Sequence, residues 1–353
     1  MTKDQVIFIR YATATLPVLA LLLLEVLVAG PWGVIALVYL TLFAALLDKW
    51  LTPPISRDIA QAKPHWPDRL SAILGLGHLV LLPCLMLYIA SPAHGGGEKL
   101  ATLLAVASFM GQISHPNAHE LIHRRPAWLS GLGMAVYTSM IFGQHVSAHR
   151  LVHHRFVGTK DDPNTPLSGE SFWRYLPRAW IGSFKAGLAQ ENAKLTRKSM
   201  PAHSLQNPYY IWVAGGALTL ILALALGGVA GLFAMIGLAA LAHIQIMLSD
   251  YIQHYGLTRL TRSDGRLEPV GAHHSWNAPR GFTSYLMLNA PSHSDHHMHP
   301  DRPYDSLTVS KGAPVLPFSM PIMAVIATIP PVWHRNMDKR AARVMAAAQA
   351  ALP

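Results

Sequence analysis

The sequence predicts an all-α integral membrane protein with six transmembrane helices and a histidine-rich cap on one side of the bilayer. Hydrophobic residues make up 51% of the 353 residues and charged residues only 13%, whereas about 25% of the residues in an average soluble domain are charged. The apolar residues are gathered into runs close to the length that crosses a bilayer, about 20 residues. Lysine and arginine are concentrated in the segments that would lie on one side of those runs.

Six apolar runs are long enough, or nearly long enough, to cross a membrane. Gly30 and Pro31 separate the first run from the second, and Gly227 and Gly228 separate the fifth from the sixth. The first run is interpreted as an anchor rather than a signal peptide, because no small-residue cleavage site stands out after it and another run follows at once. The expected spans are residues 11–29, 32–47, 70–90, 99–117, 208–226 and 229–249.

Three further segments are expected to lie outside the spans. Residues 129–143 are apolar but too short to cross comfortably, so a buried or interfacial helix is expected there. Residues 314–333 contain five prolines, which favours a packed or interfacial segment over a seventh span. Residues 341–350 are expected to form a short helical tail.

The distribution of positive charge predicts the topology. Lysine and arginine are concentrated in the N-terminus, residues 48–69, residues 118–207 and the chain after residue 250. The positive-inside rule then places both termini of this multi-pass protein in the cytoplasm. A bacterial inner membrane is expected as a separate hypothesis. We expect one membrane domain over residues 1–353, capped on the cytoplasmic side by residues 118–207 and 250–340.

Cysteine content and net charge exclude several classes of protein. The single cysteine, Cys84, rules out an intrachain disulfide, a Cys-ligated iron–sulfur cluster and a zinc ribbon. The net charge of +10 is attributed to the cytoplasmic face of a membrane protein. No nucleic-acid-binding motif is present, so no nucleic-acid partner is expected.

The histidines form clusters that this topology places on one membrane face. Residues i and i+4 share a helix face, so His119 and His123 could bind one metal ion together, and so could His149 and His153. His154 points about 100° away from His153 and could reach a second ion. Further clusters follow the sixth span, at His254, His273, His274, His293, His296 and His297.

The chemistry of imidazole narrows the choice of metal ion. Imidazole suits zinc, copper, iron and nickel. One ion cannot use eight or nine nitrogens, whereas two ions can, with coordination positions left open, and redox-active iron with open positions activates O₂. Carboxylates should orient neutral imidazole ligands through the other ring nitrogen. The candidates for this surrounding shell are Glu120, Asp161, Asp162, Asp250 and Asp295, together with His273 and His274.

The histidine clusters are also compatible with two other kinds of metal protein. The stretch from His119 to His123 also fits the zincin pattern, in which two histidines bind zinc and the glutamate between them is a general base. That pattern leaves the other histidine clusters unexplained. A metal transporter or sensor is the non-enzymatic alternative, but such proteins usually place their ligands at mid-membrane or in histidine-rich loops.

The histidine motifs resemble those of a known family, over residues from about 10 to 340. The chain is similar to the membrane-bound alkane monooxygenases and to the hydroxylase component of xylene monooxygenase. The resemblance implies a non-haem di-iron enzyme that inserts one oxygen atom of O₂ into a terminal or benzylic C–H bond. It also implies nine ligands, at His119, His123, His149, His153, His154, His254, His293, His296 and His297.

Two positions differ from the alkane branch of that family. That branch usually has glutamate immediately before His149 and before His254, where this sequence has Ala148 and Gln253, which look more like the xylene branch. The motifs from His273 to Asn277 and from His293 to His297 look more like the alkane branch. The mixture leaves alkane and methylarene substrates open, and acyl desaturases, which have related histidine motifs, remain a further alternative.

The expected substrate and partner follow from this resemblance. An apolar hydrocarbon would enter from the lipid bilayer into a cavity lined by Leu40, Phe43 and Gly111. The chain has no nucleotide-binding GxGxxG loop, so a separate protein must supply electrons. We expect an acidic rubredoxin-like carrier, or a ferredoxin-type reductase as in the xylene branch, attracted by basic residues beside the histidines. These residues are Arg124, Arg125, Arg150, Arg155 and Lys160.

Overall fold

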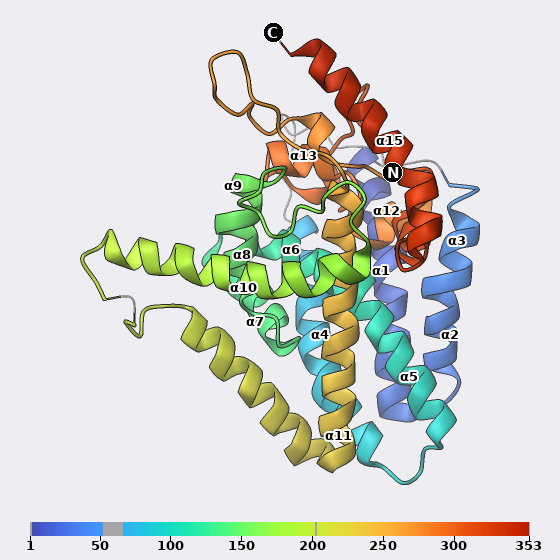
Figure 1. Cartoon of the computed structure of the whole chain (residues 1–353). Helices are drawn as coiled ribbons and strands as arrows, with labels where there is room; N and C mark the ends of the chain where they lie inside the picture. The colour runs from blue at the N-terminus through green and yellow to red at the C-terminus, as the bar shows by residue number, and fades with distance from the viewer. Residues whose placement is uncertain (1, 52–65, 202, 353) are drawn as a thin grey trace.

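The computed structural model describes residues 2–51, 66–201 and 203–352, and its architecture is helical (Figure 1). Long helices form a bundle, and shorter helices and loops cover one end of it. Within these ranges there is no β-sheet, and strand-like pairing is limited to two isolated bridges, Thr261 with Leu267 and Asn277 with Val315. The all-α class expected from the sequence is therefore confirmed.

Three helices of the bundle are long and apolar enough to cross a membrane. They are α1 (Lys3–Val28), α4 (Trp66–Ala90) and α11 (Tyr209–His254). A shorter apolar rod consists of α2 (Trp32–Val38), the π-helical turn η1 (Tyr39–Phe43) and α3 (Ala44–Leu47). Another rod consists of α5 (Gly96–Phe109), the π-helical turn η3 (Met110–Ser114) and α6 (His115–Ile122).

The long helix α11 is two helices joined at Gly228. This glycine has φ 59° and ψ −159°, a backbone conformation that glycine adopts far more readily than other residues. The two limbs meet there at the lower end of the bundle (Figure 1). The reversal lies at the pair of glycines that the sequence analysis placed between two spans.

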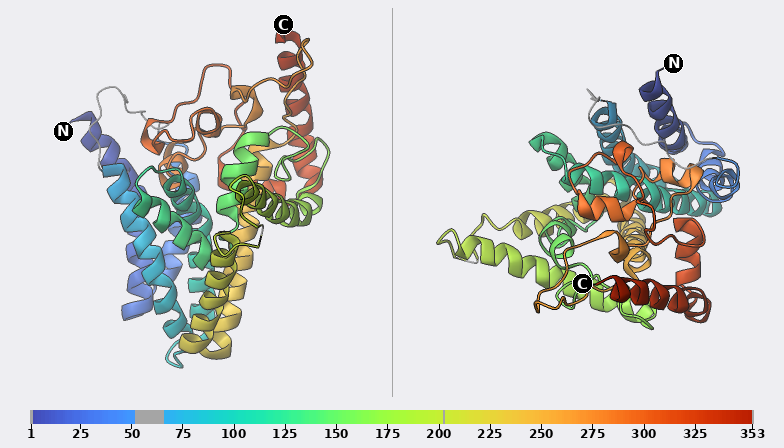
Figure 2. Two further views of the ribbon diagram at one scale, coloured as in Figure 1. Left: turned by 90° about the vertical axis from the view of Figure 1, so that its left-hand side faces the viewer. Right: turned by 90° about the horizontal axis from the view of Figure 1, so that it is seen from above.

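The cap is built from the remaining helices. They are α7 (Ala127–Ser139), α8 (His145–Ala148), η4 (His149–His153), α9 (His154–Phe156), α10 (Phe172–Thr196), η5 (Ala272–His274), α12 (Gly281–Leu286), α13 (His293–Met298), η6 (Tyr304–Ser306), α14 (Met320–Ala327) and α15 (Pro330–Ala351). Most of them are short, although α10 has 25 residues and α15 has 22. Both ends of the chain lie at this end of the bundle (Figures 1 and 2).

The C-terminal helix is longer than expected. The sequence predicted a tail over residues 341–350, whereas α15 begins at Pro330. Its prolines stand in the first turn, where a missing N–H costs no helical hydrogen bond. The prolines therefore start this helix rather than interrupt it.

A buried carboxylate ties four rods of the bundle together. Glu25 of α1 is only 2% exposed. It accepts hydrogen bonds from the Tyr88 hydroxyl of α4 at 2.7 Å and the backbone N–H of Gly33 at 2.9 Å. The Thr102 hydroxyl of α5 lies 3.3 Å away and also donates to it. Because an ionisable group inside the bundle is costly unless it is bonded, these contacts fix the register of α1, α2, α4 and α5.

Candidate metal centre

Nine histidines converge where the bundle meets the cap, and they form two groups. In each group the candidate ligand atoms lie within 4.8 Å of one another. The first imidazole group consists of His119, His123, His149, His154 and His296. The second imidazole group consists of His153, His254, His293 and His297.

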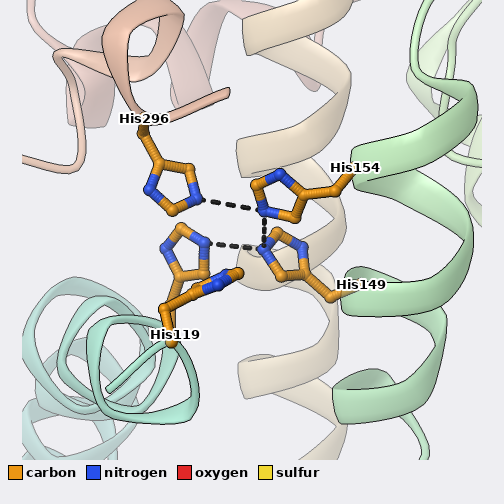
Figure 3. A group of neighbouring side chains, drawn as sticks. His119, His149, His154 and His296 are labelled. Atoms are coloured by element: carbon orange, nitrogen blue, oxygen red, sulfur yellow. Dashed lines mark hydrogen bonds between the residues drawn. The ribbon is translucent and has the colours of Figure 1, made fainter. Parts of the chain in front are cut away.

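The first imidazole group draws on three regions of the chain. α6 carries His119 and is followed by His123, the segment η4–α9 carries His149 and His154, and α13 carries His296. Figure 3 shows four of these rings pointing toward one another. The Nε2 atoms lie 2.7 Å apart between His119 and His149, 2.8 Å between His149 and His154, and 3.2 Å between His154 and His296.

The second imidazole group joins the end of α11 to α13 and η4. His293 and His297 are four residues apart on α13 and share a face. The Nε2 atom of His293 lies 3.0 Å from Nε2 of His254 and 3.0 Å from Nε2 of His297. His153 completes the group from η4, and its ring centroid is 4.8 Å from that of His254.

This donor set fits metal ions. Nε2 of His123 and Nε2 of His153 are buried and have no hydrogen-bond partner among the described residues. A neutral imidazole has one N–H and one lone pair, so several converging Nε2 atoms are best satisfied by a cation between them. Burial and the neighbouring imidazoles also lower the pKa values of His119, His149 and His154, which keeps these rings in the neutral form that binds metal.

The division of His149 and His153 between the two groups differs from the expectation. Spacing i,i+4 predicted that these two would bind one ion and that His154 would reach another. Instead, His149 lies with His154, and His153 belongs to the other group. The reason is that η4 is π-helical. Hydrogen bonding from i to i+5 widens the turn, so that residues five apart come onto one face.

Two residues of the expected surrounding shell contact candidate ligands. Nδ1 of His153 donates to the Asp162 carboxylate at 2.9 Å, and Nδ1 of His254 donates to the backbone carbonyl of His274 at 3.0 Å. Both bonds leave the Nε2 atoms of His153 and His254 facing the other rings of the second imidazole group. Burial lowers the pKa of His153, but Asp162 outweighs it and the pKa is raised. Asp250 accepts a bond from Asn164 at 2.7 Å, and the backbone N–H of Asn164 donates to Asp162.

Three other carboxylates proposed from the sequence do not contact the histidine ligands. Glu120 pairs with Arg124 and accepts the backbone N–H of Tyr304. Asp295 binds Arg302 at 2.6 Å and His299 at 2.8 Å. Asp161 is exposed at the surface. The bonds of Glu120 and Asp295 instead hold parts of the cap together.

A third cluster joins His273 and His274, which the sequence placed in the surrounding shell, to Glu268, which it did not single out. Nε2 of His274 lies 2.9 Å from the Glu268 carboxylate, and Nε2 of His273 lies 3.2 Å from it. The backbone N–H of Gly271 donates to Nδ1 of His274 at 2.8 Å. Nε2 of His274 must therefore carry the proton and donate to Glu268. This cluster thus holds in place His274, whose backbone carbonyl accepts the hydrogen bond from Nδ1 of His254.

One cavity adjoins the imidazole groups, and a second cavity shares part of its wall. A small polar cavity is lined by His119, His149 and His293, and also by His115 and His145, neither of which the sequence analysis assigned to the site. An apolar cavity of about 340 Å³ lies beside it. Ser249 and Met287 line both. The residues that line the apolar cavity include Leu40, Gly111, Leu248, Ile252, Met320 and Val325.

One residue expected in this cavity lies elsewhere. Leu40 and Gly111 line the apolar cavity, as the sequence analysis expected. Phe43 instead lines a separate pocket with Tyr39 and Phe282. Along the rod, Leu40 and Phe43 are three residues apart, but the π-helical turn η1 separates their faces.

The fold and site define a class of helical membrane protein with a histidine-rich metal centre, and the comparisons with known proteins specify the family. Residues 99–308 match the family model described as fatty acid desaturase. Alkane 1-monooxygenase 1 of Pseudomonas aeruginosa is 30% identical over 295 residues, 79% of this chain and 76% of that protein. The xylene/toluene monooxygenase hydroxylase component XylM of Pseudomonas putida is 31% identical over 249 residues, 67% of this chain and 63% of that protein.

A second Pseudomonas aeruginosa protein, alkane 1-monooxygenase 2, is 31% identical over 243 residues, 69% of this chain and 64% of that protein. The chain belongs to the fatty acid desaturase family, and within it to the group of alkane 1-monooxygenases and XylM. This confirms the resemblance found in the histidine motifs. The protein is therefore an oxidoreductase of the hydroxylase type, and its apolar helices are those of an integral membrane protein.

Proposed function

We propose that this protein hydroxylates a terminal methyl group of an apolar hydrocarbon, using O₂ and two iron ions. The observation that carries the proposal is the position of the two imidazole groups beside an apolar cavity in a chain related to alkane 1-monooxygenases. The balanced reaction is RCH₃ + O₂ + 2e⁻ + 2H⁺ → RCH₂OH + H₂O. The nine histidines would hold the two irons, which when bound supply the chemistry of O₂ activation.

The other side chains of the site orient the ligands and hold the substrate. Asp162 and the His274 carbonyl fix the rings of His153 and His254 through Nδ1. The apolar cavity binds the hydrocarbon, and the shared wall at Ser249 and Met287 brings its methyl group to the polar cavity. Val325 of α14, itself 64% exposed, lines the cavity, which supports entry of the substrate from the bilayer.

The arrangement in the membrane is part of the proposal. We propose a single domain over residues 1–353 in a bacterial inner membrane. The charge distribution agrees with six spans and with a cytoplasmic cap over residues 118–207 and 250–340. The reversal at Gly228 and the position of both chain ends at the cap support an even number of crossings. The irons would then face the cytoplasm.

The electron donor is proposed to be a small acidic carrier, rubredoxin-like, with a ferredoxin-type reductase as the alternative. Arg150, Arg155 and Lys160 are exposed beside the histidine motifs, and Arg125 has a side chain that is 88% exposed. Such a surface steers an acidic partner electrostatically. Arg124 does not belong to it, because this side chain is only 11% exposed and pairs with Asp68 and Glu120.

A methylarene hydroxylase is the second candidate, favoured by the similarity to XylM and by Ala148 and Gln253. A zincin-like protease is disfavoured. The glutamate of its motif would have to act as a base beside the metal, whereas Glu120 is bonded to Arg124 and to the backbone of Tyr304. Product analysis separates the hydroxylases from a desaturase or a metal transporter.

The test is the turnover of purified, iron-loaded protein with NADH, a rubredoxin and its reductase, with n-octane and p-xylene as substrates. About two irons per chain and O₂-dependent alcohol are expected. His154→Ala and His297→Ala should each lose iron and activity. His299→Ala is the matched control, since this neighbouring histidine bonds Asp295 and belongs to neither imidazole group. Full iron content without O₂-dependent product from either substrate would contradict the proposal.

A further inference from the structure

The apolar cavity is lined by one polar side chain with a buried oxygen that has no hydrogen-bond partner among the described residues. Four polar residues line it: Thr41, Gln112, Gln245 and Ser249. Thr41 donates to the Leu37 carbonyl at 2.7 Å, and Ser249 donates to Gln253 at 2.8 Å. Gln245 donates through Nε2 to the Ala107 carbonyl at 2.9 Å. In contrast, Oε1 of Gln112 is buried and has no hydrogen-bond partner among the described residues.

An unbonded amide at this place is costly. A buried acceptor without a donor has lost its hydration and gained no bond in return, which destabilises the protein. The walls around Gln112 are otherwise mostly aliphatic, with Leu40, Leu248 and Ile252 among them. The amide would therefore be satisfied by a bound ligand that offers a hydrogen-bond donor.

The backbone beside Gln112 lets the side chain of Gln245 approach closely. Gln112 stands in the π-helical turn η3, and such turns often occur at functional sites. Its neighbour Gly111 allows the side chain of Gln245 to cross the helix closely, because a Cβ at position 111 would collide with Oε1 of Gln245. η1, a second π-helical turn, contributes Leu40 and Thr41 to the same cavity.

The position of Gln112 sets the length of the ligand. It precedes His119 by seven residues on a continuous helical rod, which corresponds to about 10 Å along the axis. The cavity reaches the polar cavity beside His119 through the shared wall of Ser249 and Met287. A ligand with its polar group at Gln112 would thus present its other end, about 10 Å away, to the imidazole groups.

We propose that Gln112 recognises a hydroxyl group, and that the substrates of this protein include medium-chain primary alcohols hydroxylated at the far methyl group. This inference rests on the proposed function and specifies its substrate class. A hydroxyl both donates and accepts, as an amide does. A carboxylate or an ammonium group would lose its hydration in this cavity without an ion partner.

The reaction is the same oxygen insertion applied to the opposite end of the molecule. It is HOCH₂–R–CH₃ + O₂ + 2e⁻ + 2H⁺ → HOCH₂–R–CH₂OH + H₂O, with both electrons supplied by the carrier of the proposed function. One C–H bond is broken and one C–O bond is formed. The second oxygen atom leaves as water.

The first experiment compares kcat/KM for 1-octanol, measured as 1,8-octanediol, with kcat/KM for n-octane. Gln112→Leu should lower the 1-octanol/n-octane ratio about 10-fold, the effect of losing one buried hydrogen bond. Thr41→Val is the matched control in the same cavity. Its hydroxyl already bonds Leu37, so this substitution should change both values by the same factor. An unchanged ratio in Gln112→Leu would overturn the inference.

The second experiment does not depend on turnover. Added 1-octanol should raise the unfolding temperature of the detergent-purified, iron-loaded protein with a saturable concentration dependence. Gln112→Leu should abolish that rise, and Thr41→Val should keep it. If water rather than a hydroxyl ligand satisfies Gln112, wild type and Gln112→Leu will respond alike, and the inference fails. A Gln112-dependent rise without any hydroxylation would instead reject the proposed function and leave the alcohol-binding site standing.

Discussion

Replacing Asp162 by asparagine should weaken metal binding in the second imidazole group while sparing the first. One carboxylate oxygen of Asp162 accepts from Nδ1 of His153 at 2.9 Å and from the Thr165 hydroxyl at 2.8 Å, and the other accepts the backbone N–H of Asn164 at 3.0 Å. An asparagine has one acceptor oxygen in place of two, so its NH₂ group would face a donor. His153 would lose either its orientation or its preferred tautomer.

The size of the effect follows from the loss of one buried, charge-assisted bond. Such bonds contribute about 1.5–3 kcal/mol. Loss of a carboxylate that orients a histidine ligand typically costs 10–100-fold in metal affinity or activity. These ranges agree, because a factor of ten corresponds to about 1.4 kcal/mol. We expect Asp162→Asn to bind the second iron 10–100-fold more weakly and to lose activity in proportion.

The assay is metal content by mass spectrometry after dialysis against a graded series of chelator concentrations, with hydroxylation measured in parallel. Asp162→Asn should release about one iron per chain at a chelator concentration that wild type resists. Asp161→Asn is the matched control, because this neighbouring residue is exposed. Equal iron retention in wild type and Asp162→Asn, or equal loss in both variants, would refute the reasoning.

Three further predictions concern the cavity, the carrier and the bundle. Leu40→Trp should reduce the volume of the apolar cavity and shift product formation toward shorter hydrocarbons at unchanged iron content, and an unchanged chain-length profile would contradict entry through this cavity. Lys160→Glu should raise the KM for an acidic carrier severalfold at about 50 mM salt and much less at 500 mM, because the docking charge is screened; a salt-independent effect would exclude electrostatic docking. Glu25→Leu should lower the unfolding temperature in detergent, since it leaves the Tyr88 hydroxyl and the Gly33 N–H without their acceptor, and it should leave the products of the remaining folded enzyme unchanged.

The sequence alone predicted the helical class, most helix positions and the family, because each depends on local or compositional signals. Apolar runs mark helices, and the glycines at 227 and 228 mark a reversal. The histidine motifs carry their own spacing. All nine histidines that the resemblance implied as ligands are those that the structure brings into two groups. The membrane role of these helices likewise follows from composition, as three of them are long and apolar enough to span.

Tertiary structure decided which histidines share a group and which polar groups face them. Helical periodicity assigned His149 and His153 to one ion, but the π-helical turn η4, whose i→i+5 bonding no residue pattern announced, puts His149 with His154. Contacts between segments far apart in the chain, such as the pairing of Glu120 with the Tyr304 backbone, likewise escaped local patterns. The unpaired amide of Gln112 has no sequence signal at all, because hydrogen-bond satisfaction depends on which neighbours the fold brings within 3.5 Å of the oxygen.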